Sequence, residues 1–170
     1  MSRLLRRRLV LAGLLLVTAA CSGPSVPVQD ALEVLEIKTG YDNGGRAAGQ
    51  NRLLPAITFK VRNRSSGSVR SVQFNAVFRV VGDTEELGAQ LVRGIDWSGL
   101  GAGGTAGPYV LRSTFGYSGE QARGQMFQHD GFKDVQVELF AKQGGAQWVK
   151  LNDQVVDRQL LAIAPSTAAK

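Results

Sequence analysis

Apolar and polar residues alternate most clearly along residues 55–63. The apolar side is made by Ile57, Phe59 and Val61, and the residues between them are polar. Successive side chains of a β-strand point to opposite faces of a sheet, so a period of two predicts a strand with one buried face. Residues 55–63 are therefore expected to form a half-buried strand.

A second alternating stretch, residues 69–81, follows a polar turn at residues 63–68. Its apolar side comprises Val72, Phe74, Ala76, Phe78 and Val80. Each stretch has one apolar and one polar face, which is typical of antiparallel sheets. We therefore expect the two stretches to form an antiparallel hairpin.

Weaker versions of the same pattern continue along the chain. They lie at residues 31–38, 87–97, 109–117, 134–142 and 148–151, with residues 155–163 as a last strand or a short helix. Turn or loop signals separate them at residues 42–45, 99–107 and 143–146. Residues 118–130 have no clear period, and a helical turn is possible at residues 120–126.

Seven or so short strands with turns between them predict an all-β fold, in which two antiparallel sheets pack as a β-sandwich. The sandwich domain is expected over residues 31–163, followed by a flexible tail at residues 164–170. About 150 residues remain after the first 20, which is enough for one domain with a hydrophobic core.

The first 21 residues follow a different pattern. Four arginines precede an apolar run that starts at Leu9, and small residues then lead to Cys21, the single cysteine of the chain. This order predicts an export signal over residues 1–20. The run is shorter than the ~20 residues that a membrane-spanning helix needs, which disfavours an uncleaved anchor. An ordinary secretory signal cleaved near Ala20, with Cys21 incidental, remains an alternative.

The segment Thr18-Ala19-Ala20-Cys21 resembles the lipobox of bacterial lipoproteins, although that family prefers Leu where this chain has Thr18. The resemblance implies cleavage before Cys21 and attachment of acyl chains such as palmitate at this residue. Residues 21–30, rich in Pro and Ser, would then form a lipidated tether. No aspartate follows the cysteine, which in this family implies the outer membrane, with the protein facing the periplasm.

A second resemblance covers about half of the chain. The strand end Phe59-Lys60-Val61-Arg62-Asn63, the polar turn and the long strand after it resemble the immunoglobulin-like domains of small bacterial envelope lipoproteins, such as the group named for its Phe-x-Leu-Tyr-Asp motif. That motif itself is absent, and stress-associated sandwich domains share the same strand pattern. The resemblance implies an immunoglobulin-like β-sandwich.

The net charge of +6 overstates the basic character of the mature protein. Without the four arginines of residues 1–20, 16 basic and 14 acidic residues remain, which makes no case for nucleic acid as a partner. Five cations are expected on the outer side of the hairpin: Lys60, Arg62, Arg64, Arg70 and Arg79. They form either a solvated face that guards an edge strand or a patch for anionic headgroups.

Candidate catalytic and cofactor motifs are weak. Gly99, Gly101 and Gly104 match a dinucleotide fingerprint, but the following residues, which include Pro108, cannot open the helix that this motif requires. The chain lacks a Gly-x-Ser-x-Gly nucleophile elbow. We therefore expect no enzyme activity and no cofactor.

His129 is the single histidine, with Asp130 next to it and Met126 three residues before it, a set that could suggest copper or zinc. A metal site normally needs three or four convergent ligands, so a loop histidine is the preferred interpretation and no metal site is expected. Phe127 and Phe132 lie on the same aperiodic segment, and we expect these two rings to be exposed. With His129 they are the candidate partner-contact residues. The remaining aromatic candidates, Trp97, Tyr109, Phe115, Tyr117 and Trp148, are expected mostly in the core.

The sequence thus predicts a non-catalytic, lipid-anchored envelope protein that acts as a binding or assembly module in the periplasm, with an envelope protein as its partner. One alternative is a carrier of a small apolar ligand between the two sheets. A less favoured alternative is a metal-binding protein that uses His129.

Overall fold

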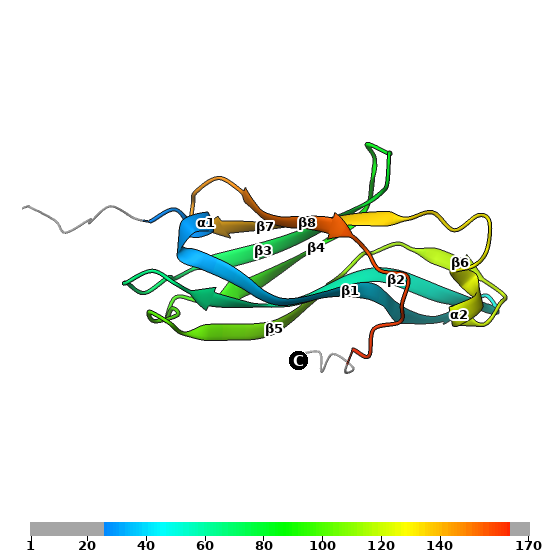
Figure 1. The fold of residues 1–170 in the computed structure, drawn as a ribbon, viewed down its shortest axis with the longest axis horizontal. Helices are drawn as coiled ribbons and strands as arrows, with labels where there is room; N and C mark the ends of the chain where they lie inside the picture. The colour runs from blue at the N-terminus through cyan, green and yellow to red at the C-terminus, as the bar shows by residue number, and fades with distance from the viewer. Residues whose placement is uncertain (1–25, 164–170) are drawn as a thin grey trace, which may run out of the picture.

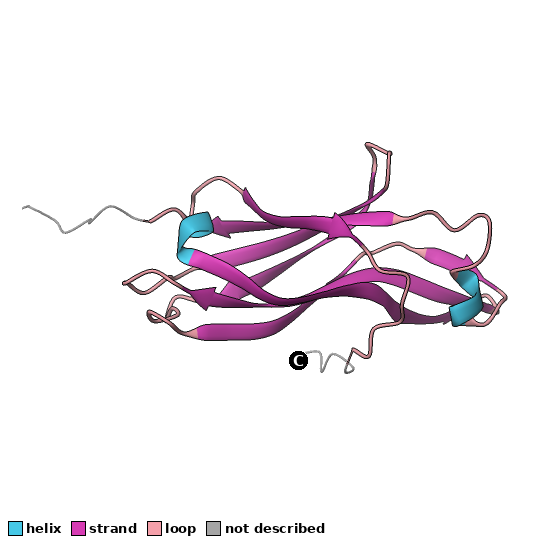
Figure 2. Cartoon of the chain, in the orientation of Figure 1, coloured by secondary structure: helices cyan, strands magenta, loops and turns pink. Residues whose placement is uncertain are grey.

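The computed structural model describes residues 26–163, which form two packed antiparallel sheets (Figures 1 and 2). The first sheet contains β1 (Leu32–Ala47), β2 (Gln50–Asn63), β5 (Thr105–Arg112) and β6 (Tyr117–Gly119), with β1 on one side of β2 and both β5 and β6 on the other. The second has the order β4 (Glu86–Ile95), β3 (Val72–Val80), β7 (Val135–Gln143) and β8 (Val149–Val155). The expectation of an all-β, two-sheet antiparallel fold is confirmed.

Two short helices lie at opposite ends of the sandwich (Figure 2). They are α1 (Val28–Ala31) and α2 (Arg123–Met126). Val28 is buried, so the folded body includes residues that the sequence assigned to the tether at 21–30. Neither helix of residues 26–163 is long and apolar enough to cross a membrane. The predicted signal at 1–20, the lipid site at Cys21 and the tail at 164–170 lie outside the described residues.

The expected hairpin between residues 55–63 and 69–81 is wrong. β2 pairs with β1, β5 and β6, whereas β3 pairs with β4 and β7 in the other sheet. The two strands meet through their faces, with the rings of Phe59 and Phe74 edge to face at 5.3 Å. Alternation identifies the buried face of a strand, but it does not identify the strand that lies beside it.

The turn predicted at residues 42–45 is also wrong. β1 continues through this stretch to Ala47, and the chain reverses at Ala48 and Gly49, which both have positive φ as a type I′ hairpin turn requires. The Asn-Gly-Gly sequence instead gives a register shift between Asn43 and Arg46. Residues typical of turns are also suited to β-bulges.

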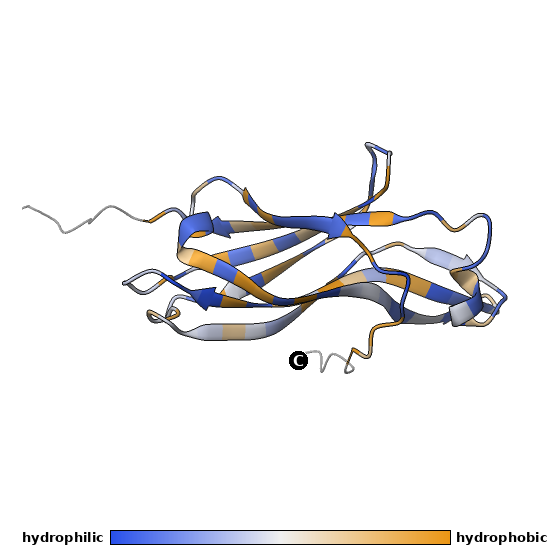
Figure 3. Ribbon diagram, in the orientation of Figure 1, coloured by the Kyte–Doolittle hydropathy of each residue, from blue (hydrophilic) through white to orange (hydrophobic). Residues whose placement is uncertain are grey.

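The core lies between the sheets, and alternating apolar and polar residues are visible along the strands in Figure 3. The predicted inward faces of β2, β3 and β7 are buried, except that Val80 at the end of β3 is half-buried. The fully buried members of these three strands include Ile57, Val61, Val72, Phe74, Phe78, Val135, Val137 and Leu139. The period of two therefore predicted the core of the central strands correctly.

Three aromatic residues expected in the core are on the surface instead. The side chain of Trp97 is 81% exposed, that of Phe115 is 62% exposed and that of Trp148, in the β7–β8 loop, is 37% exposed. Trp97 follows the end of β4, and Phe115 lies between β5 and β6, so neither side chain belongs to a strand face that packs on the other sheet. Conversely, Tyr41, which the sequence placed at the edge of a turn, is completely buried.

The basic residues assigned to one hairpin face are divided between the two sheets. Lys60 and Arg62 lie on β2, where they pair with Glu36 at 2.9 Å and Glu33 at 2.6 Å, whereas Arg79 lies on β3 and pairs with Glu138. The single basic face predicted for the hairpin therefore does not exist. Partly exposed ion pairs of this kind add little stability, about 0–1 kcal/mol each.

Candidate functional site

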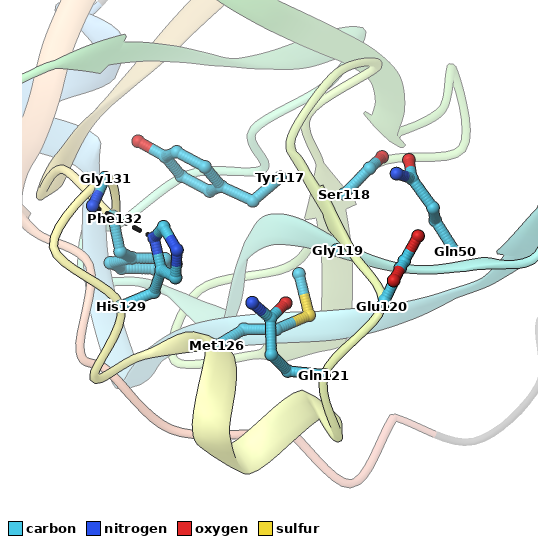
Figure 4. A pocket seen from close by; sticks show the side chains of 10 residues that line it. All are labelled: Gln50, Tyr117, Ser118, Gly119, Glu120, Gln121, Met126, His129, Gly131 and Phe132. Atoms are coloured by element: carbon cyan, nitrogen blue, oxygen red, sulfur yellow. Dashed lines mark hydrogen bonds between the residues drawn. The ribbon is translucent and has the colours of Figure 1, made fainter.

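A pocket of about 380 Å³ opens at the end of the sandwich opposite α1 (Figures 1 and 4). Its lining residues are Gln50, Tyr117, Ser118, Gly119, Glu120, Gln121, Met126, His129, Gly131 and Phe132. The lining combines aromatic and thioether groups with amide, hydroxyl and carboxylate groups. This size and mixed composition are typical of sites that hold one small ligand or one side chain of a partner.

Pairing between β6 and β2 places one wall of the pocket. Tyr117 lies opposite Leu53 on β2, and Gly119 lies opposite Asn51. The approach requires Gly116, because a Cβ at that position would lie 2.0 Å from the carbonyl oxygen of Leu53. The Asn51 side-chain amide also donates a hydrogen bond to the carbonyl oxygen of Gln121 at 2.8 Å, which holds the rim.

An aromatic cluster forms the base of the pocket. The rings of Tyr117 and Phe132 lie 4.4 Å apart, and Tyr41 contacts Phe132 and Phe127, each at 5.3 Å between ring centroids. Arg158 covers Phe132, with its guanidinium 5.2 Å from the ring centroid. Aromatic pairs of this geometry contribute roughly 0.5–1.5 kcal/mol each beyond their buried area, so the pocket has a rigid base.

The structure corrects the expected exposure of the candidate contact residues. Phe132 is only 7% exposed and Phe127 is half-buried, because both rings pack in the aromatic cluster. His129 is exposed and lines the pocket together with Phe132, whereas Phe127 is not among the lining residues. The structure thus places His129 and Phe132 at one pocket, and it adds Tyr117, Ser118 and Gln50 of β2, which the sequence pattern did not single out.

His129 is oriented by its own loop. Its Nδ1 accepts the backbone N–H of Gly131 at 3.0 Å, the dashed line in Figure 4, so the neutral ring carries its proton on Nε2. Within residues 26–163, the imidazole makes this one hydrogen bond. No carboxylate of these residues orients the ring as the aspartate of a catalytic triad does. Residues 26–163 contain no group of three His, Cys, Asp or Glu side chains placed to share a metal ion.

The hydroxyl of Tyr41 is buried in the cluster and has no hydrogen-bond partner among the described residues. Burial, together with the nearby Tyr117 and Asp134, raises the pKa of Tyr41 above its ordinary value of 10.0, and Arg158 opposes this effect. The folded state therefore holds this proton more tightly than the unfolded chain. The resulting contribution to stability is complete below pH 10 and is lost as the pH rises above 10.

Tyr41→Phe is expected to raise the free energy of unfolding at neutral pH by up to ~1 kcal/mol, because it removes an unpaired buried hydroxyl and keeps the ring. It should also weaken the loss of stability above pH 10. Urea unfolding of both proteins at neutral and alkaline pH measures these effects. Tyr109→Phe is the matched control, since the Tyr109 hydroxyl donates to the carbonyl oxygen of Gly94 at 2.7 Å. Equal destabilisation by the two substitutions would contradict the assignment of Tyr41 as unpaired.

Comparison with known proteins assigns no family. The sequence matches no protein-family model, and no curated protein matches it. Among solved structures, it is similar to the X-ray structure of Northeast Structural Genomics Consortium target SoR45, with 12% sequence identity and a TM-score of 0.43. The similarity covers 81% of this chain and 96% of that chain.

Proposed function

We propose that this protein is a non-catalytic, lipid-anchored envelope protein of the periplasm, most simply of the outer membrane, and that its pocket binds an envelope protein. The observation that carries the proposal is the position of the pocket. The pocket is lined by residues of β6 and α2, which lie at the end of the sandwich opposite α1 (Figure 1). The predicted tether, residues 21–30, leads into the sandwich at the α1 end.

The length of the sandwich supports this arrangement. β1 joins the two ends and has 16 residues, so at ~3.3 Å per residue it spans about 50 Å. A domain anchored at the α1 end by the acyl chains of Cys21 would hold the pocket well away from the bilayer, within reach of other envelope proteins.

The chemistry of the pocket favours a protein segment as its occupant. Tyr117, Met126 and Phe132 offer an apolar surface for one hydrophobic side chain, and the amide groups of Gln50 and Gln121 can bind a peptide backbone. Thioether and aromatic groups adapt to side chains of different shape.

The strand order also supports an immunoglobulin-like subtype of the sandwich. The chain forms the β1–β2 pair in one sheet and the β3–β4 pair in the other, returns for β5 and β6, and ends with β7–β8 in the second sheet. Consecutive strand pairs that alternate between two antiparallel sheets are a property of immunoglobulin-like sandwiches.

Photocrosslinking in the native cells tests the proposal. A photoreactive residue at Gln121, on the pocket rim, is expected to give one discrete product with an envelope protein, whereas the same residue at the exposed Thr84, on the β3–β4 loop, is not. Ser118→Trp should abolish the product, because Ser118 lines the pocket and a tryptophan side chain would fill it. Thr84→Trp is the matched control and should leave it unchanged.

Two results would contradict the proposed pocket function. One is the absence of a product at Gln121, and the other is a product that persists in Ser118→Trp. Aromatic residues are well suited to strands such as β6, and circular dichroism of each variant confirms that it is folded.

A further inference from the structure

We propose that the α1 end of the sandwich docks directly on the surface of an anionic bilayer, through the two tryptophans Trp97 and Trp148 and the cations Arg70, Arg93 and Lys142. We call this set the docking face. The inference rests on the proposed lipid anchor at Cys21, and it adds an orientation: the domain lies against the membrane rather than swinging freely on its tether.

The elements that carry the docking face are held together. The backbone N–H of Gly144, in the β7–β8 loop, donates to the carbonyl oxygen of Ser71 at 2.9 Å, and Val69 pairs with Leu100 in the β4–β5 loop. Trp97 and Gly144 line a common hollow with Arg93. Three loops from different parts of the chain therefore form one continuous surface.

The start of the described chain lies on the same surface. A groove of about 390 Å³ is lined on one side by Val26 to Gln29. On the other side it is lined by Ala146 and Gln147 of the β7–β8 loop and by the adjoining strand ends, Gln143 and Val149. Four residues lie between Cys21 and Val26. The five steps from one Cα to the next in a fully extended chain of that length span at most ~18 Å. An acylated Cys21 would hold the bilayer within that distance of the docking face.

The tryptophans have the character of a membrane-interface contact. The sequence contains two tryptophans, and both lie on this face. Trp97 is 81% exposed and Trp148 is 37% exposed, with the Nζ of Lys142 5.8 Å from the Trp148 ring centroid. Indole rings favour the headgroup region, where one edge of the ring contacts water and the other contacts acyl chains.

The charges of this face match anionic headgroups. Arg70, Arg93 and Lys142 form no salt bridge with the described residues, in contrast to Arg62, which pairs with Glu33 immediately behind the face. Two acids lie nearby. Asp30 is exposed on α1, and Asp96 accepts hydrogen bonds from the backbone N–H and hydroxyl of Ser98 at 2.9 and 2.6 Å. With Arg64 included, this end of the sandwich carries four basic residues and these two carboxylates. Juxtamembrane cations of this kind are attracted by anionic lipid.

Tryptophan quenching in reconstituted vesicles tests the inference. The full chain, produced with its acyl chains and carrying Trp148→Phe, contains Trp97 as its single tryptophan. It is reconstituted into vesicles of phosphatidylglycerol and phosphatidylcholine in which the acyl chains carry bromine. Docking predicts a loss of Trp97 emission relative to vesicles without bromine, and a weaker loss in phosphatidylcholine alone.

The triple variant Arg70→Gln, Arg93→Gln, Lys142→Gln isolates the electrostatic contribution. At about fivefold per cation near an anionic surface, it should lower the ratio of docked to undocked protein on the order of 100-fold. The matched control is a second triple variant, Arg46→Gln, Arg52→Gln, Lys133→Gln. It removes the same charge near the pocket end and should leave the quenching of Trp97 unchanged.

Flotation of the vesicles separates failure of the inference from failure of the anchor. Protein that does not float with the vesicles would contradict the lipid anchor and, with it, the docking. Protein that floats but shows unquenched Trp97 would overturn the docking alone and leave Trp97 as a contact for a protein. Quenching that is equal in both lipid mixtures would overturn the requirement for anionic lipid.

Discussion

Asn63→Ala is expected to lower the free energy of unfolding by roughly 2–4 kcal/mol, because it leaves several buried polar groups without partners. Asn63 is completely buried at the end of β2. Its Nδ2 donates to the carbonyl oxygens of Gly67 and Leu100, both at 2.7 Å, and its Oδ1 accepts the backbone N–H and the hydroxyl of Ser65 at 2.9 and 2.7 Å. One amide thus joins the β2–β3 turn to the β4–β5 loop.

Urea unfolding of the two proteins measures this effect, with Asn75→Ala as the matched control. Asn75 is a half-buried asparagine on β3 whose side chain makes no hydrogen bond to the described residues, so its replacement should cost less than ~1 kcal/mol. A loss at Asn63 as small as that at Asn75 would show that the amide does not stabilise this end of the sandwich.

The buried faces of the central strands were predictable from the sequence. Ile57, Val72 and Val137 all belong to stretches in which apolar residues recur at every second position, and all are buried. Each sheet packs one face against the other sheet and exposes its other face to water. The polarity of a residue in such a strand therefore indicates which face of the sheet it lies on.

The partners of the strands were not predictable in the same way. β2 and β3 are adjacent in sequence and both amphipathic, yet they belong to different sheets. The neighbours of a strand are set by contacts between residues far apart in the chain, such as the pairing of Leu53 with Tyr117. The alternation of apolar and polar residues within one strand does not identify those contacts.

The candidate site was predictable only in part. Of the aperiodic segment around His129, the pocket is lined by Met126, His129, Gly131 and Phe132. Phe132 was expected outside because it follows no strand period, but a loop ring can be buried by folding back on Tyr41. Tyr41 itself lies beside residues 42–45, which are typical of turns but form a register shift within β1 in the structure.

Cys21→Ser is expected to have the largest effect on the protein in the cell, a transfer from the membrane to the soluble fraction. Each buried CH₂ of an acyl chain contributes ~0.8 kcal/mol to membrane binding, and two or more chains hold a protein stably at the bilayer. Serine is close in size to cysteine, but it lacks the sulfur that would carry the lipid. The described domain is otherwise unchanged, so the pocket should remain intact in the released protein.

Labelling of cells with palmitate, followed by isolation of the wild-type protein and of Cys21→Ser, tests the central claim most directly. The account predicts label on the wild-type chain, none on the variant, and recovery of the variant from the soluble fraction. Label that persists on Cys21→Ser, or a wild-type protein that is freely soluble with an unmodified thiol, would contradict it.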